Sequence, residues 1–252
     1  MINKYILIGN RGSFLNDFEA KMLLANLDFE VYATEDYQKC IINIDNRCCV
    51  IYIGGETRDA SKMEEYNYII PKTLYIKSCS VGAFFLYLSS LSVFGYQSDD
   101  KVSVYSSRFP IDTYGITKNK LDLFVMKYGY SLNNVCIIYP ASICSGKGRS
   151  SIEKFGRLMA KFPLLKFFKL QGNLSYIERE KLIDGIILSS MSRVTGQFIY
   201  SDHRELSYYS FSYAIKIPKI TYKFFDFVAI TFSNKLSLML KTLNRGIIYE
   251  NK

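Results

Sequence analysis

Short apolar runs alternate with amphipathic stretches over the first 145 residues of the chain. Runs with the length and composition of buried strands occupy residues 5–8, 29–33, 49–53, 83–88 and 135–139. Between the first two, Phe14, Phe18, Met22 and Ala25 recur at helical spacing and give one apolar face. Residues 63–78, with an interruption at Pro71, and residues 113–128 are also expected to be helical. Strands alternating with helices predict a parallel sheet covered on both faces.

Beyond residue 145 the pattern is less regular. We expect helices over 151–162 and 178–190 and a short strand over 197–200. The tail from Lys219 is rich in Phe, Leu and Lys and is expected to be a core or lid helix; an amphipathic helix lying on a membrane is the alternative. The sequence thus predicts a first domain over 1–145 and a smaller, basic portion over 146–252 that is interleaved with it.

In an open parallel sheet, ligands bind outside the carboxyl ends of the strands. Gly9 and Gly12 lie between the first strand and the first helix. Glycines there let the backbone approach a pyrophosphate at a helix N-terminus, although an ordinary strand–helix turn has the same composition. Leu15 stands where the dinucleotide-binding pattern normally has a third glycine, and we expect it to push the helix off the strand or to tilt it.

Two signals near this turn bear on the choice of cofactor. The second strand ends at Thr34-Glu35-Asp36, and an acidic side chain there can accept hydrogen bonds from an adenosine ribose, which favours NAD. Arg11, inside the glycine turn, could pair with a 2′-phosphate, which favours NADP. The cofactor class is therefore NAD or NADP, with a slight preference for NAD.

Tyr114 and Lys118 have the spacing that places two side chains on one face of a helix. A nearby ammonium favours tyrosinate and lowers the tyrosine pKa from about 10, as a proton donor and acceptor near neutral pH requires. The other pair at this spacing, Tyr68 and Lys72, encloses Pro71, which disturbs the helix. Ser90 follows the preceding strand, and its hydroxyl could hold a substrate oxygen beside Tyr114.

The net charge of +9 is unevenly distributed. Residues 1–134 carry 14 Lys and Arg against 15 Asp and Glu, whereas residues 135–252 carry 18 against 8, a net of +10. A basic half suits an anionic small molecule, an acidic membrane surface or nucleic acid, besides a simply solvated lysine-rich face. Nucleic acid is the weakest of these, since no zinc-finger or RNA-recognition signature occurs.

Metal binding and export are not expected. The six cysteines form no C-x-x-C pair and there is a single histidine, His203. The first residues, MINKYILIGN, do not read as a signal peptide, and no apolar run approaches the roughly 18–20 residues of a membrane span. We expect reduced, mostly buried thiols in a cytoplasmic protein.

The segments LYLSSLSVFG and YGITK resemble the active-site segments of extended short-chain dehydrogenases/reductases. More narrowly, the chain resembles the NAD-dependent epimerase/dehydratase family that acts on sugar nucleotides. IGNRGSFL is similar to the cofactor turn of that family, and VIYIGG, EYNYIIPKTLYIKSC and VCIIYPASICSGKG to later segments in the same order. NLSYIEREKLIDGI and LNRGIIYENK extend the likeness over nearly the whole chain. One departure is the interval of 16 residues between Ala33 and Val50, where the family normally has another strand with an Asp that contacts adenine.

The resemblance implies a Rossmann-type, doubly wound parallel sheet with a small C-terminal substrate-binding portion. It implies catalytic roles for Ser90, Tyr114 and Lys118. The residues implied to bind the cofactor are Gly9, Arg11, Gly12, Glu35, Gly54, Asn67, Lys118 and Pro140. Those implied to bind the substrate are Ser90, Ser92, Ser142, Lys147, Arg149 and Arg179, the last three as partners of a nucleoside diphosphate.

The implied activity is hydride transfer at a carbon of a nucleotide-activated sugar, in the usual case for a surface polysaccharide. Tyr114 would exchange a proton with the sugar oxygen, Lys118 would hold the nicotinamide ribose, and Ser90 would orient the same oxygen. A reductase is slightly favoured over an epimerase, because reduced adenine contacts fit an exchangeable cofactor. Leu91 argues against a dehydratase, which usually has an acidic residue beside the serine. Helix-paired homodimers are common in the family. The alternative is a non-catalytic nucleotide-binding or scaffold protein.

Overall fold

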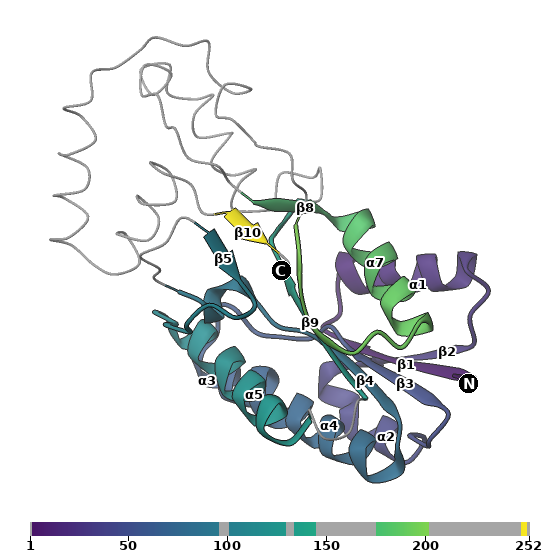
Figure 1. Cartoon of the computed structure of the whole chain (residues 1–252). Helices are drawn as coiled ribbons and strands as arrows, with labels where there is room; N and C mark the ends of the chain where they lie inside the picture. The colour runs from purple at the N-terminus through teal and green to yellow at the C-terminus, as the bar shows by residue number, and fades with distance from the viewer. Residues whose placement is uncertain (1, 96–100, 130–133, 145–174, 202–247, 251–252) are drawn as a thin grey trace, which may run out of the picture. The chain divides into compact units, whose positions relative to one another are not determined.

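The computed structural model describes residues 2–95, 101–129, 134–144, 175–201 and 248–250 (Figure 1). The chain divides into two compact units. The first unit comprises Met1–Val93, Thr113–Tyr139 and Glu180–Phe198, and the second comprises Phe94–Asp112, Pro140–Arg179 and Ile199–Lys252. The predicted helix over 151–162 and the tail from Lys219 lie outside the described residues.

A six-stranded sheet forms the centre of the first unit. Its strands are β1 (Lys4–Gly9), β2 (Phe29–Ala33), β3 (Cys48–Tyr52), β4 (Phe84–Leu88), β6 (Val135–Pro140) and β9 (Gly196–Tyr200). Their spatial order is β2-β1-β3-β4-β6-β9, and the pairings from β2 to β6 are parallel. The five strands predicted up to residue 139 and the short strand near 197–200 are therefore confirmed, with small shifts at their ends. The sheet is the Rossmann-type sheet that the sequence predicts.

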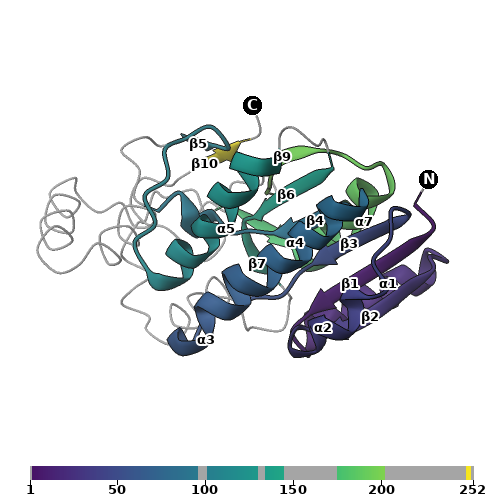
Figure 2. The same ribbon diagram turned by 90° about the horizontal axis from the view of Figure 1, so that it is seen from below.

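Helices cover both faces of this sheet. They are α1 (Ser13–Leu24), α2 (Tyr37–Ile41), α3 (Ala60–Glu64), α4 (Ile70–Val81), α5 (Thr113–Gly129) and α7 (Arg179–Met191). In both views α1 and α7 lie on one face, whereas α4 and α5 lie on the other (Figures 1 and 2). An ion pair joins the first two, with Lys21 Nζ 2.9 Å from Asp184 Oδ1. This arrangement buries both faces of the strands, as their continuous apolar composition requires.

The helix predicted over 63–78 is continuous but irregular. A π-helical turn, Glu65–Ile69, joins α3 to α4, and Pro71 lies at the start of α4. Proline has no N–H to donate to the preceding turn, and its ring crowds the carbonyl group there. The chain accommodates both effects by widening that turn, so that the predicted interruption is a π-helical turn.

Leu15 is accommodated in the core. It is buried together with Phe18 and Met22 on α1, whereas the predicted face member Ala25 is exposed beyond the end of the helix. A Cβ atom added to Gly9 would lie 3.3 Å from Leu15 Cδ1. Ile53 is closer still, with its Cγ1 atom 2.7 Å from that position, so Ile53 and Leu15 together fill the space beside Gly9.

The interval between β2 and β3 contains no further strand. It holds a single 3₁₀ turn, Thr34–Asp36, followed by α2. The doubly wound order 3-2-1-4-5-6 has a strand outside its second one, and here β2 is the edge strand. The predicted loss of the adenine-side strand is thus confirmed.

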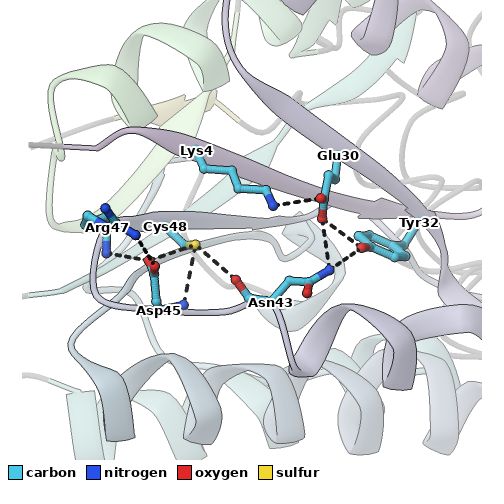
Figure 3. Close-up of polar contacts among 7 residues, drawn as sticks. All are labelled: Lys4, Glu30, Tyr32, Asn43, Asp45, Arg47 and Cys48. Atoms are coloured by element: carbon cyan, nitrogen blue, oxygen red, sulfur yellow. Dashed lines mark hydrogen bonds and ion pairs between the residues drawn. The ribbon is translucent and has the colours of Figure 1, made fainter.

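Polar side chains tie the loop after α2 to this edge (Figure 3). Glu30 of β2 accepts hydrogen bonds from Lys4 Nζ at 2.7 Å and from Tyr32 Oη at 2.7 Å. Asn43 Nδ2 donates to Tyr32 Oη at 2.9 Å and to Glu30 at 3.2 Å. The hydrogen bond from Lys4 is the largest cause of the lowered pKa of Glu30. A charged, hydrogen-bonded cluster of this kind discourages pairing with a further strand.

The second unit has two small parallel sheets among its described residues. β5 (Lys101–Ser103) pairs with β10 (Ile248–Glu250), and β7 (Ser142–Cys144) pairs with β8 (Tyr176–Glu178). Gly95 forms an isolated bridge with Phe109. Its φ is +50°, and a Cβ atom there would lie 1.6 Å from the Phe109 carbonyl oxygen. The chain therefore needs glycine at this position.

Candidate functional site

Asn10 ties together the carboxyl ends of three neighbouring strands. Its Oδ1 accepts a hydrogen bond from Thr34 Oγ1 at 2.6 Å, and its Nδ2 donates to the Gly55 carbonyl oxygen. Asn10 follows β1, the fully buried Thr34 follows β2, and Gly55 lies beyond β3. These contacts fix the start of the glycine turn. The sequence analysis did not select Asn10 or Thr34, although a polar residue directly after a buried strand was a usable signal.

The glycine turn itself leaves room beside α1. Gly12 is the N-cap residue of this helix, and no side-chain hydrogen bond caps the helix there. A Cβ atom on Gly12 would meet no described atom within 4 Å. The turn thus has, at Gly12, the open backbone that an approaching phosphate requires.

The side chain that favours NADP, Arg11, lies beside the acidic side chains that favour NAD. Arg11 Nε is 3.9 Å from Glu35 Oε1, and Arg11 Nη2 is 3.6 Å from Asp36 Oδ2. The pKa of Asp36 is lowered, first by its hydrogen bond with Lys39. The Arg11 side chain is 75% exposed, so these long ion pairs are weak and can open for a ligand.

Lys118 is buried between the ends of β3 and β4. It is 2% exposed, and its Nζ donates to the carbonyl oxygens of Leu88 at 2.8 Å and Gly54 at 3.2 Å. Burial lowers the pKa of Lys118 to about 8, and the charge of Asp122 opposes this effect. Tyr114 is half-buried one turn earlier on α5. The predicted pair therefore combines a desolvated amine with a more accessible phenol on one helix.

Asn67 holds the loop after β3 against α5. It lies in the π-helical turn and is fully buried. Its Oδ1 accepts from the Glu56 N–H at 2.9 Å, and its Nδ2 donates to the Glu56 carbonyl oxygen at 2.9 Å and to Thr117 Oγ1 at 3.1 Å. A Cβ atom on Gly55 would lie 3.1 Å from Asn67 Oδ1 and 3.2 Å from Lys118 Nζ. Asn67 and Lys118 therefore meet at this glycine.

Ser90 and Ser92 form one short turn after β4. Their hydroxyl oxygens are 3.1 Å apart, and the Ser92 N–H donates to Ser90 Oγ at 3.1 Å. Both residues are half-buried. The adjoining 3₁₀ turn, Leu91–Val93, packs against α5, the helix of Tyr114. Within the first unit, the fold brings the predicted serine segment to the helix that carries the predicted Tyr–Lys pair.

The remaining predicted site residues belong to the second unit. Pro140 ends β6, Ser142 begins β7 and is exposed, and Arg179 begins α7. Lys147 and Arg149 lie outside the described residues. Their roles toward a substrate stay predictions.

A buried acidic residue, Asp122, was missed by the sequence analysis. It is fully buried on α5, one turn after Lys118. Its Oδ1 accepts a hydrogen bond from Tyr87 Oη at 2.7 Å, and its Oδ2 accepts from Ser89 Oγ at 2.9 Å. Its spacing of four residues from Lys118 was the available signal.

All six cysteines lie among the described residues and are free thiols, four of them buried, as predicted. Within the described ranges, no group of three or more His, Cys, Asp or Glu side chains could hold a metal ion. No helix in the same ranges has the length and hydropathy needed to cross a membrane.

No protein-family model matches the sequence, and no curated protein sequence matches it. The structure is similar to a dTDP-4-dehydrorhamnose reductase from Clostridium acetobutylicum, with a TM-score of 0.66 and 16% identity over 99% of this chain and 83% of that one. It is also similar to the Bacillus anthracis dTDP-4-dehydrorhamnose reductase in complex with NADP (TM-score 0.65, 16% identity, 88% and 86% of the two chains). A third similar structure is the Bordetella bronchiseptica enzyme WbmG in complex with NAD and UDP (TM-score 0.63, 14% identity, 80% and 73%).

At these identities the likeness establishes the fold. The neighbours agree with the resemblance of the sequence to extended short-chain dehydrogenases/reductases, and the chain has their Rossmann-type architecture.

Proposed function

We propose that the chain is an NAD(P)-dependent enzyme that acts on a nucleotide-activated sugar, as a reductase in preference to an epimerase. The observation that carries the proposal is the placement of Lys118. A lysine amine is buried between two strand ends, one helical turn from Tyr114 and on the helix that packs against the Ser90 segment. Burying an amine is costly, so its presence at this place supports a functional role. The structural neighbours include enzymes named for a dTDP-sugar and one bound to NAD and UDP.

The residues present fit a dinucleotide. The open turn from Gly9 to Gly12 would hold the pyrophosphate, Glu35 or Arg11 would meet the adenosine ribose, and Lys118 would meet the nicotinamide ribose. The other proposed cofactor contacts are Gly54, Asn67 and Pro140. A bound nicotinamide would supply or accept the hydride. The space left at Gly12 and the close approach of Lys118 to Gly55 support this assignment.

Tyr114 would exchange the proton. At pH 7 an amine with a pKa of about 8 is mostly protonated, and a cation one turn away favours the tyrosinate form of Tyr114. The Ser90 hydroxyl, oriented by its contact with Ser92, would hold the same sugar oxygen. Ser142, Lys147, Arg149 and Arg179 would bind the substrate, the basic ones its diphosphate. Surface polysaccharide biosynthesis in the cytoplasm, by a homodimer, is part of the same proposal.

The test is calorimetry with NADH and NADPH on the purified protein. The proposal expects one of them to bind with a clear preference, and Tyr114→Phe to bind it equally well. Oxidation of the bound cofactor in the presence of dTDP- or UDP-linked 4-keto sugars should then occur with the wild type and be lost in Tyr114→Phe. Failure of a folded protein to bind either cofactor at millimolar concentration would favour the non-catalytic alternative, which the missing adenine-side strand supports.

A further inference from the structure

Helix α5 contacts the end of β4 at two successive residues, through side chains of opposite charge. Lys118 Nζ donates to the Leu88 carbonyl oxygen at 2.8 Å. One turn later, Asp122 Oδ2 accepts from Ser89 Oγ at 2.9 Å. The next residue along the chain is Ser90, the proposed partner of the sugar oxygen.

The geometry of this contact is built from both elements. Lys118 and Asp122, at i and i+4, share one face of α5. Tyr87 and Ser89, at i and i+2 along β4, point to one side of the sheet, and their hydroxyl groups donate to the two carboxylate oxygens of Asp122 at 2.7 and 2.9 Å. The acid is therefore held in a fixed place by two donors from the strand.

Burial of the Asp122 carboxylate costs free energy unless hydrogen bonds and an opposite charge compensate for it. Asp122 is fully buried and Lys118 is 2% exposed. A buried carboxylate is tolerated when hydrogen bonds and an opposite charge compensate for its lost hydration. Two hydroxyl donors and the ammonium of Lys118 meet that requirement. Removing the acid would leave the ammonium buried without an opposing charge.

Other ionisable groups near Lys118 do not provide that charge. Tyr114 lies on α5 itself, and Tyr87 on β4 donates its hydroxyl to Asp122. Glu56, beyond β3, accepts hydrogen bonds from the N–H groups of residues 57–59 instead. Among the described residues, Asp122 is the group whose charge opposes the effect of burial on Lys118.

We propose that Asp122 is a positioning residue: with Tyr87 and Ser89 it forms a buried anionic site that keeps Lys118 protonated and fixes the strand end before Ser90. The benefit to catalysis rests on the proposed function, whereas the coupling between the two charges does not. Asp122 itself would touch neither cofactor nor substrate, because both of its oxygens face the hydroxyl groups of β4.

The test is an NMR titration of the protein with lysine isotopically labelled at Cε, in which the Lys118 signal is assigned by its loss in Lys118→Met. The wild-type midpoint should lie near pH 8. In Asp122→Asn, which keeps the shape of the side chain, the midpoint should fall by about one pH unit or more, as expected when an opposing charge is removed.

Ser89→Ala is the matched control, because it breaks one hydrogen bond of the network but keeps the carboxylate. It should not lower the midpoint. An unchanged midpoint in Asp122→Asn, or an equal fall in Ser89→Ala, would overturn the proposal. If Asp122→Asn does not fold, the apolar triple variant Asp122→Leu, Tyr87→Phe, Ser89→Ala replaces the network at similar volume and should show the same fall.

Calorimetry with NADH and NADPH on the same proteins distinguishes failure of the proposed function from failure of this inference. A folded wild-type protein that binds neither NADH nor NADPH would contradict the proposed function and leave the titration result intact. A Lys118 titration midpoint that is the same in the wild type and in Asp122→Asn would overturn this inference, whether or not a cofactor binds.

Discussion

Replacing Lys118 by methionine should change the stability of the protein by an amount that depends on pH. The pKa of Lys118 is about 8 in the folded protein, against 10.5 for an ordinary lysine. Since one pKa unit corresponds to about 1.4 kcal/mol, the buried ammonium costs about 3 kcal/mol of folding free energy when it is charged in both states. Methionine has a similar unbranched shape and no charge, so it removes this cost.

The direction in which the stability of the wild type changes with pH follows from proton binding at Lys118. Between about pH 8 and pH 10.5 the unfolded chain binds more protons at this lysine than the folded chain, so wild-type stability rises with pH in that window. Below pH 8 the full cost is present. The variant also loses the hydrogen bonds to Gly54 and Leu88 and the charge that opposes Asp122. These losses offset the gain, so the change in stability with pH, and not the sign of the net effect, tests the cost of the ammonium.

The assay is urea unfolding of the wild type and Lys118→Met at pH 7 and pH 10. The free energy of unfolding of the variant minus that of the wild type should decrease by about 2–3 kcal/mol between these pH values. Lys120→Met is the control, because Lys120 is an exposed lysine two residues away, 2.8 Å from Glu64. Other groups that titrate in this range, including the buried cysteines, cancel in the difference. A difference that is constant with pH, or that grows toward pH 10, would refute the conclusion that Lys118 is buried as a cation.

Two further substitutions test the second unit and the choice of cofactor. Gly95→Ala should destabilise the protein by more than about 2 kcal/mol, because φ is +50° and the new Cβ would overlap the Phe109 carbonyl oxygen. Gly82→Ala, at φ +76° with open space around the Cβ, is the control for backbone strain alone, and comparable urea midpoints for the two variants would contradict the steric account. Arg11→Ala should weaken NADPH binding relative to NADH in calorimetry, because the carboxylate of Glu35 would then face a 2′-phosphate without its present partner; stronger NADPH binding would show that Arg11 does not recognise that phosphate.

Most of the strands were predictable because they are short apolar runs that end at glycine, serine or proline. The run over 49–53 corresponds to Cys48–Tyr52 and the run over 29–33 to Phe29–Ala33. The interval between them was correctly predicted to lack a strand, since it contains no second apolar run. The sequence predicted where the helix is disturbed, at Pro71, but not the form of the disturbance. A π-helical turn depends on how the neighbouring turns relax.

Spacing along one element carries only part of the information about the candidate site. Tyr114 and Lys118 share a helix, and a four-residue interval reveals such a pair. Asn67 acts through Thr117, fifty residues away in sequence. Asp122 acts through Tyr87, 35 residues away. No local pattern reports contacts of this kind, because the sheet order that creates them is a property of the whole fold.

The two ends of the proposed cofactor site differ in how they are supported. On the adenine side the sheet ends at β2, and the contacts near Arg11 and Glu35 are exposed and long. On the Lys118 side the polar groups are buried, and several form short hydrogen bonds that link different helices and strands. Exposed ion pairs contribute little free energy, whereas buried hydrogen-bonded charges are costly to disturb. Changes at Arg11 or Glu35 should therefore alter how tightly a dinucleotide is held without altering proton transfer, whereas changes at Lys118 or Asp122 should alter proton transfer first. That division fits an enzyme that exchanges its cofactor in each cycle, which is the reason to favour a reductase over an epimerase.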